Sequence, residues 1–150
     1  MQTLKINNLD IKAVAGGTDR ICYLLYPAAV SGQWIEHATA LYGVSIAVIT
    51  GMDWDNDLTP WKAKGVPTGT PDFKGDAPQF LSLLRQSVIP EVEQRLGIAS
   101  DVRRTLAGVS LSGLFTLWQW MECDVFTDII SLSGSVSYTH LRAHETSAHL

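Results

Sequence analysis

The chain has 150 residues, of which 46% are hydrophobic and 17% charged, and its formal net charge is −4. This composition is typical of a globular domain and too apolar for a disordered protein. The acidic charge argues against nucleic acid as a partner. No stretch reaches the roughly 20 apolar residues of a membrane span, and residues 1–8 contain no apolar signal core, so we expect a cytoplasmic protein without a membrane partner.

The first part of the chain alternates between strand and helix signals. Residues 4–14 alternate loosely and predict one or two edge strands. The apolar run 21–26, closed by Pro27, predicts a strand buried on both faces of a parallel sheet. Apolar residues at helical spacing predict a helix over 32–41, and residues 44–50 predict the next buried strand.

A long loop rich in Gly, Pro, Asp and Trp follows over residues 51–75, and a loop of that length in a compact domain is usually functional. Its candidate site residues are Trp54, Asp55 and Trp61, because tryptophans can form the walls of a mostly apolar pocket. The alternative is a loop that folds back on its own aromatic residues while its Asp and Asn side chains cap turns. The residues favour neither interpretation.

The alternation continues in the second part of the chain. A helix is expected from a cap at Asp76 to about residue 96, with a kink at Pro90. Strands are predicted over 105–109 and 128–133. The helix between them, residues 111–121, is apolar around most of its circumference, as expected of a helix in the core.

Alternating strands and helices with short connections predict a three-layer α/β fold with a mostly parallel sheet. The reactive centre of such a sheet lies at the carboxyl ends of its strands. We expect the Arg103-Arg104 pair to be a solvated strand entry. Cys22 and Cys123 are isolated in the sequence, so they predict reduced structural thiols rather than a disulfide framework or a metal site.

The turn Gly108-Val109-Ser110-Leu111-Ser112-Gly113 stands between a predicted strand and a predicted helix. There it is a candidate nucleophile elbow, in which a strained turn raises a serine hydroxyl above the sheet edge. The pattern is G-x-S-x-S instead of the usual G-x-S-x-G, with Ser112 in place of a glycine. A plain strand-to-helix connection rich in Ser and Gly is the alternative.

Residues 106–115 and 131–135 resemble the strand, elbow, helix and next strand of esterase-D-like α/β-hydrolases, which include the siderophore (enterochelin-type) esterases. Residues 49–61 also look like the loop after the fourth strand of that group, and the resemblance covers roughly residues 20–135. It implies a carboxylic-ester hydrolase that acts on a small-molecule ester through an acyl-enzyme at Ser110, with no cofactor and no metal. The elbow geometry and the family pattern imply oxyanion donors at the backbone N–H groups of Leu111 and Ala28, with Ala29 as the alternative to Ala28. A non-catalytic binding protein of the same fold, permitted by Ser112, is the second interpretation.

Residues 136–150 do not continue the family pattern and resemble translated sequencing-adapter read-through. We therefore expect a partial α/β-hydrolase domain over residues 1–135 and a non-native tail over 136–150. Histidines 140, 144 and 149 lie in that tail. His37 precedes Ser110, whereas the catalytic acid and histidine of this fold follow the nucleophile. Both are expected beyond Ser135 of the natural sequence, which would leave this C-terminally truncated fragment inactive. The sequence makes no prediction of oligomeric state.

Overall fold

The computed structural model describes residues 1–17, 19–65 and 69–132. Their strands form one sheet in the order β1-β2-β4-β3-β5-β6. Strands β4, β3, β5 and β6 run parallel to one another, while β1 and β2 form a hairpin whose second strand, β2, pairs antiparallel with β4. The strands are β1 (Gln2–Ile6), β2 (Leu9–Val14), β3 (Arg20–Leu25), β4 (Ser45–Thr50), β5 (Arg103–Val109) and β6 (Asp128–Leu132). The predicted mostly parallel α/β sheet is confirmed.

The hairpin at the amino terminus forms because apolar residues alternate along both strands around a tight turn. Asn7 adopts a positive φ of 51° in that turn, a conformation that asparagine tolerates better than most residues. Leu4, Leu9 and Ile11 are buried on the inner face. Of these two strands only β1 lies at an edge of the sheet, because β2 lies between β1 and β4. The alternating pattern of the sequence does not reveal this pairing of β2 with β4.

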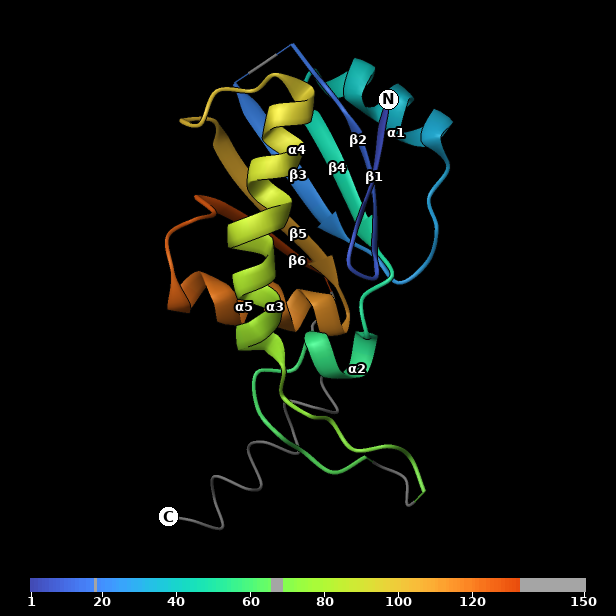
Figure 1. Cartoon of the computed structure of the whole chain (residues 1–150), viewed down its shortest axis with the longest axis vertical. Helices are drawn as coiled ribbons and strands as arrows, with labels where there is room; N and C mark the ends of the chain where they lie inside the picture. Colours follow the sequence, from blue (N-terminus) through green and yellow to red (C-terminus); the bar gives the residue numbers. More distant parts are fainter. Residues whose placement is uncertain (18, 66–68, 133–150) are drawn as a thin grey trace.

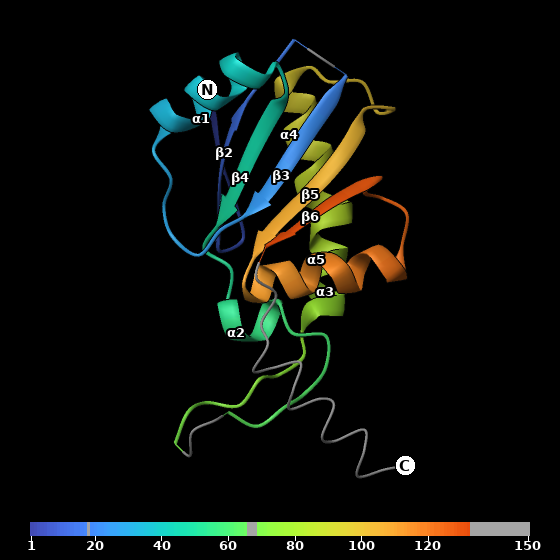
Figure 2. The ribbon, with the colours of Figure 1, turned by 180° about the vertical axis from the view of Figure 1, so that it is seen from behind.

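Helices cover both faces of the sheet (Figures 1 and 2). Helix α3 (Ala77–Leu83), the π-helix η1 (Leu84–Val88) and helix α4 (Ile89–Leu96) run as one rod over one face. Helix α5 (Leu111–Glu122) packs beside α3, with the rings of Phe80 and Phe115 5.3 Å apart. Helix α1 (Gly32–Tyr42) lies on the opposite face, and the short helix α2 (Trp54–Asp57) lies beyond the carboxyl ends of the strands.

A π-helical turn immediately precedes the segment of Pro90, the residue at which a kink was predicted. Proline has no N–H to donate and its ring collides with the carbonyl one turn earlier in a regular α-helix. Widening the helix over Leu84–Val88 places Pro90 in the first turn of α4, where a missing N–H is tolerated. The rod therefore continues to Gly97, whose φ of 67° ends it. Asp76 stands at the start of α3, although its side chain makes no capping hydrogen bond.

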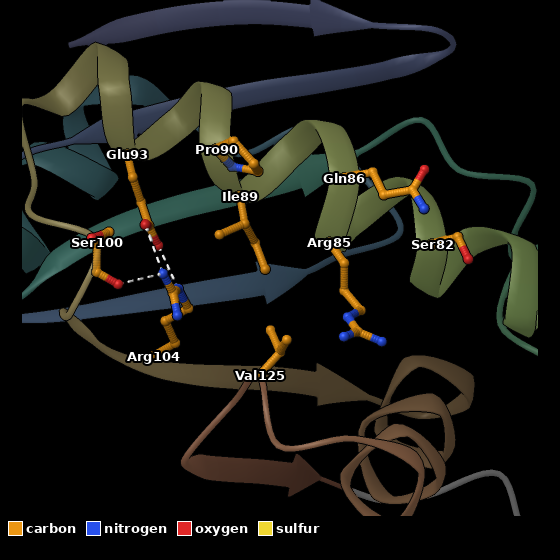
Figure 3. Close-up of a pocket in the computed structure, with 9 residues that line it drawn as sticks. All are labelled: Ser82, Arg85, Gln86, Ile89, Pro90, Glu93, Ser100, Arg104 and Val125. Carbon is orange, nitrogen blue, oxygen red and sulfur yellow. Dashed lines mark hydrogen bonds and ion pairs between the residues drawn. The ribbon is translucent and has the colours of Figure 1, made fainter.

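A buried ion pair connects this rod to the sheet (Figure 3). Glu93 of α4 is 5% exposed, and its Oε1 lies 2.6 Å from Nε of Arg104 at the start of β5. Tyr23 donates its hydroxyl to the same carboxylate at 3.0 Å. Burial, together with the Glu93 charge, raises the pKa of Tyr23 far above its ordinary value. The expected solvated strand entry is therefore wrong for Arg104. It holds for Arg103, which pairs with Asp128 at the surface, because neighbouring strand residues point to opposite faces.

Helix α5 is not buried around its circumference, contrary to expectation. Leu117, Trp120 and Met121 are exposed, while Phe115 and Thr116 face the core. The helix packs on β5 and β6, and its outer apolar residues remain at the surface of the described part of the chain. None of the helices in these residues is long and apolar enough to cross a membrane.

Candidate active site

Strand β5 passes into helix α5 through a strained turn at Ser110. The backbone angles there are φ 56° and ψ −121°. Among the described non-glycine residues, only Asn7 and Ser110 have a positive φ, and such conformations cost about 1–3 kcal/mol. Asn7 is in a hairpin turn that favours it, whereas Ser110 gains nothing comparable from its side chain. The strain therefore falls on the residue that the sequence pattern indicates as the nucleophile.

The hydroxyl of Ser110 is not used to cap the helix that it begins. A serine in this position usually accepts a hydrogen bond from an N–H of the first turn, but Ser110 makes no such bond and its side chain is exposed. Its backbone is engaged on both sides, since its N–H donates to the carbonyl of Leu132 at 2.8 Å and its carbonyl accepts from Leu114. The backbone is held while the hydroxyl faces solvent.

Two glycines allow the turn to fit against the sheet. A Cβ on Gly108 would lie 2.2 Å from the carbonyl oxygen of Ser112, and a Cβ on Gly113 would lie 2.9 Å from Oγ of Ser131. Both distances are too short for real atoms. Ser131 in turn donates its hydroxyl to the carbonyl of Gly113 at 2.8 Å. Small residues at 108 and 113 therefore let α5 start in direct contact with β5 and β6.

Ser112 occupies the position where the usual pattern has glycine, and it fits without a clash. The residue is fully buried. Its Oγ accepts the N–H of Val109 at 2.8 Å and lies 2.9 Å from the carbonyl oxygen of Leu25. The serine at this position is therefore accommodated in the turn with its hydroxyl hydrogen-bonded.

The two predicted oxyanion donors lie at the same end of the sheet as Ser110, where β3 and β5 have their carboxyl ends. Leu111 is the first residue of α5, so its N–H has no acceptor within the helix. Strand β3 pairs with β5 in parallel, with Leu25 opposite Gly108, and the loop that contains Ala28 leaves the end of β3. Ala28 is exposed. These positions suit an oxyanion site, and the roles of Leu111 and Ala28 stay predictions.

An apolar groove of about 810 Å³ lies between this loop, helix α1 and the elbow strand. Its walls include Ala29, the alternative to Ala28, together with Trp34 and Val109. The remaining lining residues are Leu24, Tyr26, Val30, Ser31, Ala107, Gly108 and Leu132. The groove in Figure 3 is a different one, beside the Glu93–Arg104 pair, and no residue of the elbow lines it.

The polar residues of the loop over 51–75 are largely occupied with one another. Asn56 donates to the carboxylate of Asp53 at 2.9 Å and accepts the N–H of Lys74 at 3.0 Å. Asp57 accepts the N–H of Asp53 at 2.9 Å. Partial burial raises the pKa of Asp57, and the charges of Asp53 and Asp76 add to that rise against the opposing hydrogen bond from the Asp53 N–H. These contacts favour turn capping as the role of Asp53, Asn56 and Asp57.

The three candidate residues of this loop differ in their surroundings. Trp54 and Trp61 are half-buried and pack against the main hydrophobic core. Asp55 is exposed, and its carbonyl accepts the hydroxyl of Thr59 at 2.9 Å. Helix α2, which carries Trp54 and Asp55, follows the carboxyl end of β4, at the same end of the sheet as the elbow. A substrate contact by any of the three stays a prediction.

The histidines and cysteines complete the set of candidate reactive side chains. His37 is exposed on α1. Histidines 140, 144 and 149, with the whole segment 136–150, lie outside the described residues. Cys22 and Cys123 are free and half-buried, and burial raises the pKa of the Cys22 thiol to about 11, so Cys22 is protonated at neutral pH.

The fold agrees with what comparison with known proteins finds. Similar solved structures include the BES protein from Bacillus cereus, with a TM-score of 0.71, 17% identity, and coverage of 96% of this chain and 66% of that one. An IroE-like serine hydrolase from Shewanella oneidensis has a TM-score of 0.70 and 17% identity, with coverage of 97% and 53%. The enterobactin and salmochelin hydrolase IroE has a TM-score of 0.63 and 20% identity, with coverage of 91% and 61%.

This chain thus spans between 53% and 66% of the length of these three structures. No curated protein matches it in sequence. The family described as "Putative esterase" matches residues 26–144, which includes the loop after β3, the loop over 51–75 and the elbow. That match covers most of the chain, and the chain belongs to this esterase family.

Proposed function

We propose that the chain is the amino-terminal part of a serine hydrolase that cleaves carboxylic esters through an acyl-enzyme on Ser110. The observation that carries the proposal is the strained, exposed Ser110 whose hydroxyl is not used in helix capping. In the proposed step, Oγ attacks the ester carbonyl and loses its proton to a base. The alkoxide leaves with a proton, and water then cleaves the acyl-serine.

The tetrahedral intermediate carries a negative charge that the backbone can stabilise. The N–H of Leu111 stands at the positive end of the α5 dipole, one residue after the nucleophile. The second donor is proposed to be the N–H of Ala28 in the loop after β3. Donors of this kind typically contribute about 10²- to 10³-fold each to the rate.

The base and its orienting acid are proposed to lie beyond Ser135 of the natural protein. They follow the nucleophile in this fold, and residues 136–150 are proposed to be foreign sequence, although the family match continues to residue 144. On this proposal the 150-residue chain holds a nucleophile without its base and turns over no ester efficiently.

The substrate is proposed to be a small-molecule ester bound at the carboxyl ends of the strands, with Trp54, Asp55 and Trp61 as candidate contacts. Two of the similar structures are named as siderophore hydrolases of Aspergillus nidulans, and IroE is named for enterobactin and salmochelin. A siderophore lactone is therefore one candidate, beside short acyl esters and sugar esters.

The test uses the natural gene product read to its own end. The complete protein should hydrolyse p-nitrophenyl acetate, and Ser110→Ala should lose at least about 10³-fold in kcat, because the nucleophile is removed. Ser82→Ala, which changes an exposed serine on α3, is the matched control and should keep full activity. Equal rates for Ser110→Ala and the unmodified protein would overturn the assignment.

The second candidate function, a non-catalytic binding protein of this fold, is addressed by a fluorophosphonate probe. The departure at Ser112 from the usual glycine is the observation that permits it. Covalent labelling of the complete protein at Ser110 excludes that alternative. A protein that remains unlabelled under conditions that label a known serine esterase supports it.

A further inference from the structure

We propose that Ser112 is a positioning residue whose hydroxyl connects the nucleophile elbow to the loop that carries the second oxyanion donor. This inference rests on the proposed function and deepens it. It assigns a role in the reaction to the residue that departs from the usual pattern.

The hydroxyl of Ser112 bridges two strands where both end. Its Oγ accepts the N–H of Val109 at 2.8 Å and lies 2.9 Å from the carbonyl oxygens of both Leu25 and Val109. A serine hydroxyl has one hydrogen to donate, so these two carbonyls share it. Val109 immediately precedes Ser110, and Leu25 is the last residue of β3, 87 positions from Ser112 in the sequence.

The bridge stands between the two parts of the site that must keep a fixed separation. Tyr26, the first residue after β3, donates its N–H to the carbonyl of Ile49 at 3.0 Å. With the Leu25 carbonyl bound to Ser112, the start of the loop is held on one side by β4 and on the other by the elbow. A reacting serine and its oxyanion donors need positions fixed to within roughly 0.5 Å, and a strained residue persists only where its surroundings determine its conformation.

A glycine at position 112, the residue of the usual pattern, has no atom that could make this connection. Removing the hydroxyl would leave the half-buried N–H of Val109 and the carbonyl of the fully buried Leu25 without that partner. The start of α5 would still be held, because Thr116 donates its hydroxyl to the backbone carbonyl of Ser112 at 2.7 Å. We therefore expect that helix α5 still forms, whereas the turn at Ser110 that precedes it is displaced.

The experiment compares Ser112→Ala and Ser112→Gly with the unmodified protein, each made from the complete natural gene. Rates of p-nitrophenyl acetate hydrolysis are expressed per site titrated by a fluorophosphonate, so that loss of folded protein does not imitate loss of catalysis. Both variants should lower kcat per titrated site by about tenfold, because small misplacements of reacting groups reduce rates by one to two orders of magnitude. KM should stay within about twofold, since Ser112 does not touch the substrate.

Ser45→Ala is the matched control, because it removes another buried serine hydroxyl. That hydroxyl accepts the N–H of Gly16 at 2.8 Å at the start of β4, at the opposite end of the sheet from the elbow. The kcat of Ser45→Ala per titrated site should stay within about twofold of the unmodified protein. If the unmodified protein is labelled while Ser112→Ala and Ser112→Gly keep its kcat, or lose no more than Ser45→Ala, the positioning role is overturned and the proposed function stands. An unmodified protein that is neither labelled nor active overturns the proposed function and this role with it.

Discussion

The elbow at Ser110 and the loop over residues 51–75 lie at the same end of the sheet, and the sequence marks both as candidates for function. They use their polar side chains in different ways. In the loop, Asp53, Asn56 and Asp57 bind one another and neighbouring backbone groups. At the elbow, Ser110 is held in a strained conformation and its hydroxyl makes no capping bond.

This difference separates a side chain that stabilises the fold from one that is available for chemistry. Buried or half-buried polar groups are normally paired, so a pairing network needs no function beyond stability. A strained backbone conformation that no local side-chain hydrogen bond offsets requires another explanation. Ser110 at the elbow is strained without such a bond, whereas the polar residues of the loop are paired.

The largest effect is expected when the packing of the elbow is broken by Gly108→Ala. The added Cβ would meet the carbonyl oxygen of Ser112 at 2.2 Å, and this oxygen belongs to the backbone and cannot rotate away. We expect a loss of about 3 kcal/mol or more in the free energy of unfolding, measured with urea on the 150-residue chain. Gly17→Ala, where a Cβ meets nothing within 4 Å, should change it by less than about 0.5 kcal/mol. Similar stabilities for the two variants would show that the elbow is not tightly packed.

A moderate effect is expected when the loop network is broken by Asn56→Ala. The change removes the amide that binds Asp53 and the oxygen that accepts the N–H of Lys74, so stability should fall by about 1–2 kcal/mol. Asp55→Ala, at the exposed neighbouring position, should leave urea unfolding within about 0.5 kcal/mol of the unmodified chain. If Asn56→Ala has no effect on stability, these hydrogen bonds do not stabilise the fold. The polar residues of the loop are then functional candidates as much as Ser110 is.

The sequence alone predicted the parts of this molecule that depend on local signals. Apolar runs located β3, β4 and β5. Gly43 and Gly97, with φ of 71° and 67°, end α1 and α4 close to the predicted ends of these helices. The elbow was predicted from its small residues and from its place between a strand and a helix. In each case neighbouring residues carry the information.

Features that depend on residues distant in the sequence were missed or mispredicted. Arg104 was expected in solvent, because nothing near it indicates that Glu93 of another element lies opposite. Ser112 counted only as a departure from the pattern, because its contact with Leu25 comes from the neighbouring strand. The exposed side of α5 depends on which elements cover it, and its apolar composition could not show that.

The smallest expected effect concerns Asp57 and tests the loop through pH. Partial burial raises the pKa of this carboxyl in the folded chain, so the folded state binds the proton more tightly than the unfolded state. The contribution of Asp57 to stability is then fully present below its ordinary pKa of about 4 and is lost as pH rises through the raised value. Asp57→Asn cannot titrate there, and its amide oxygen can still accept the N–H of Asp53. The variant should therefore gain stability relative to the unmodified chain between acidic and neutral pH, by less than about 0.5 kcal/mol because solvent screens a half-exposed group. Urea unfolding of both proteins at several pH values measures this difference, and a difference that stays constant with pH would mean that the loop does not hold Asp57 in the environment described.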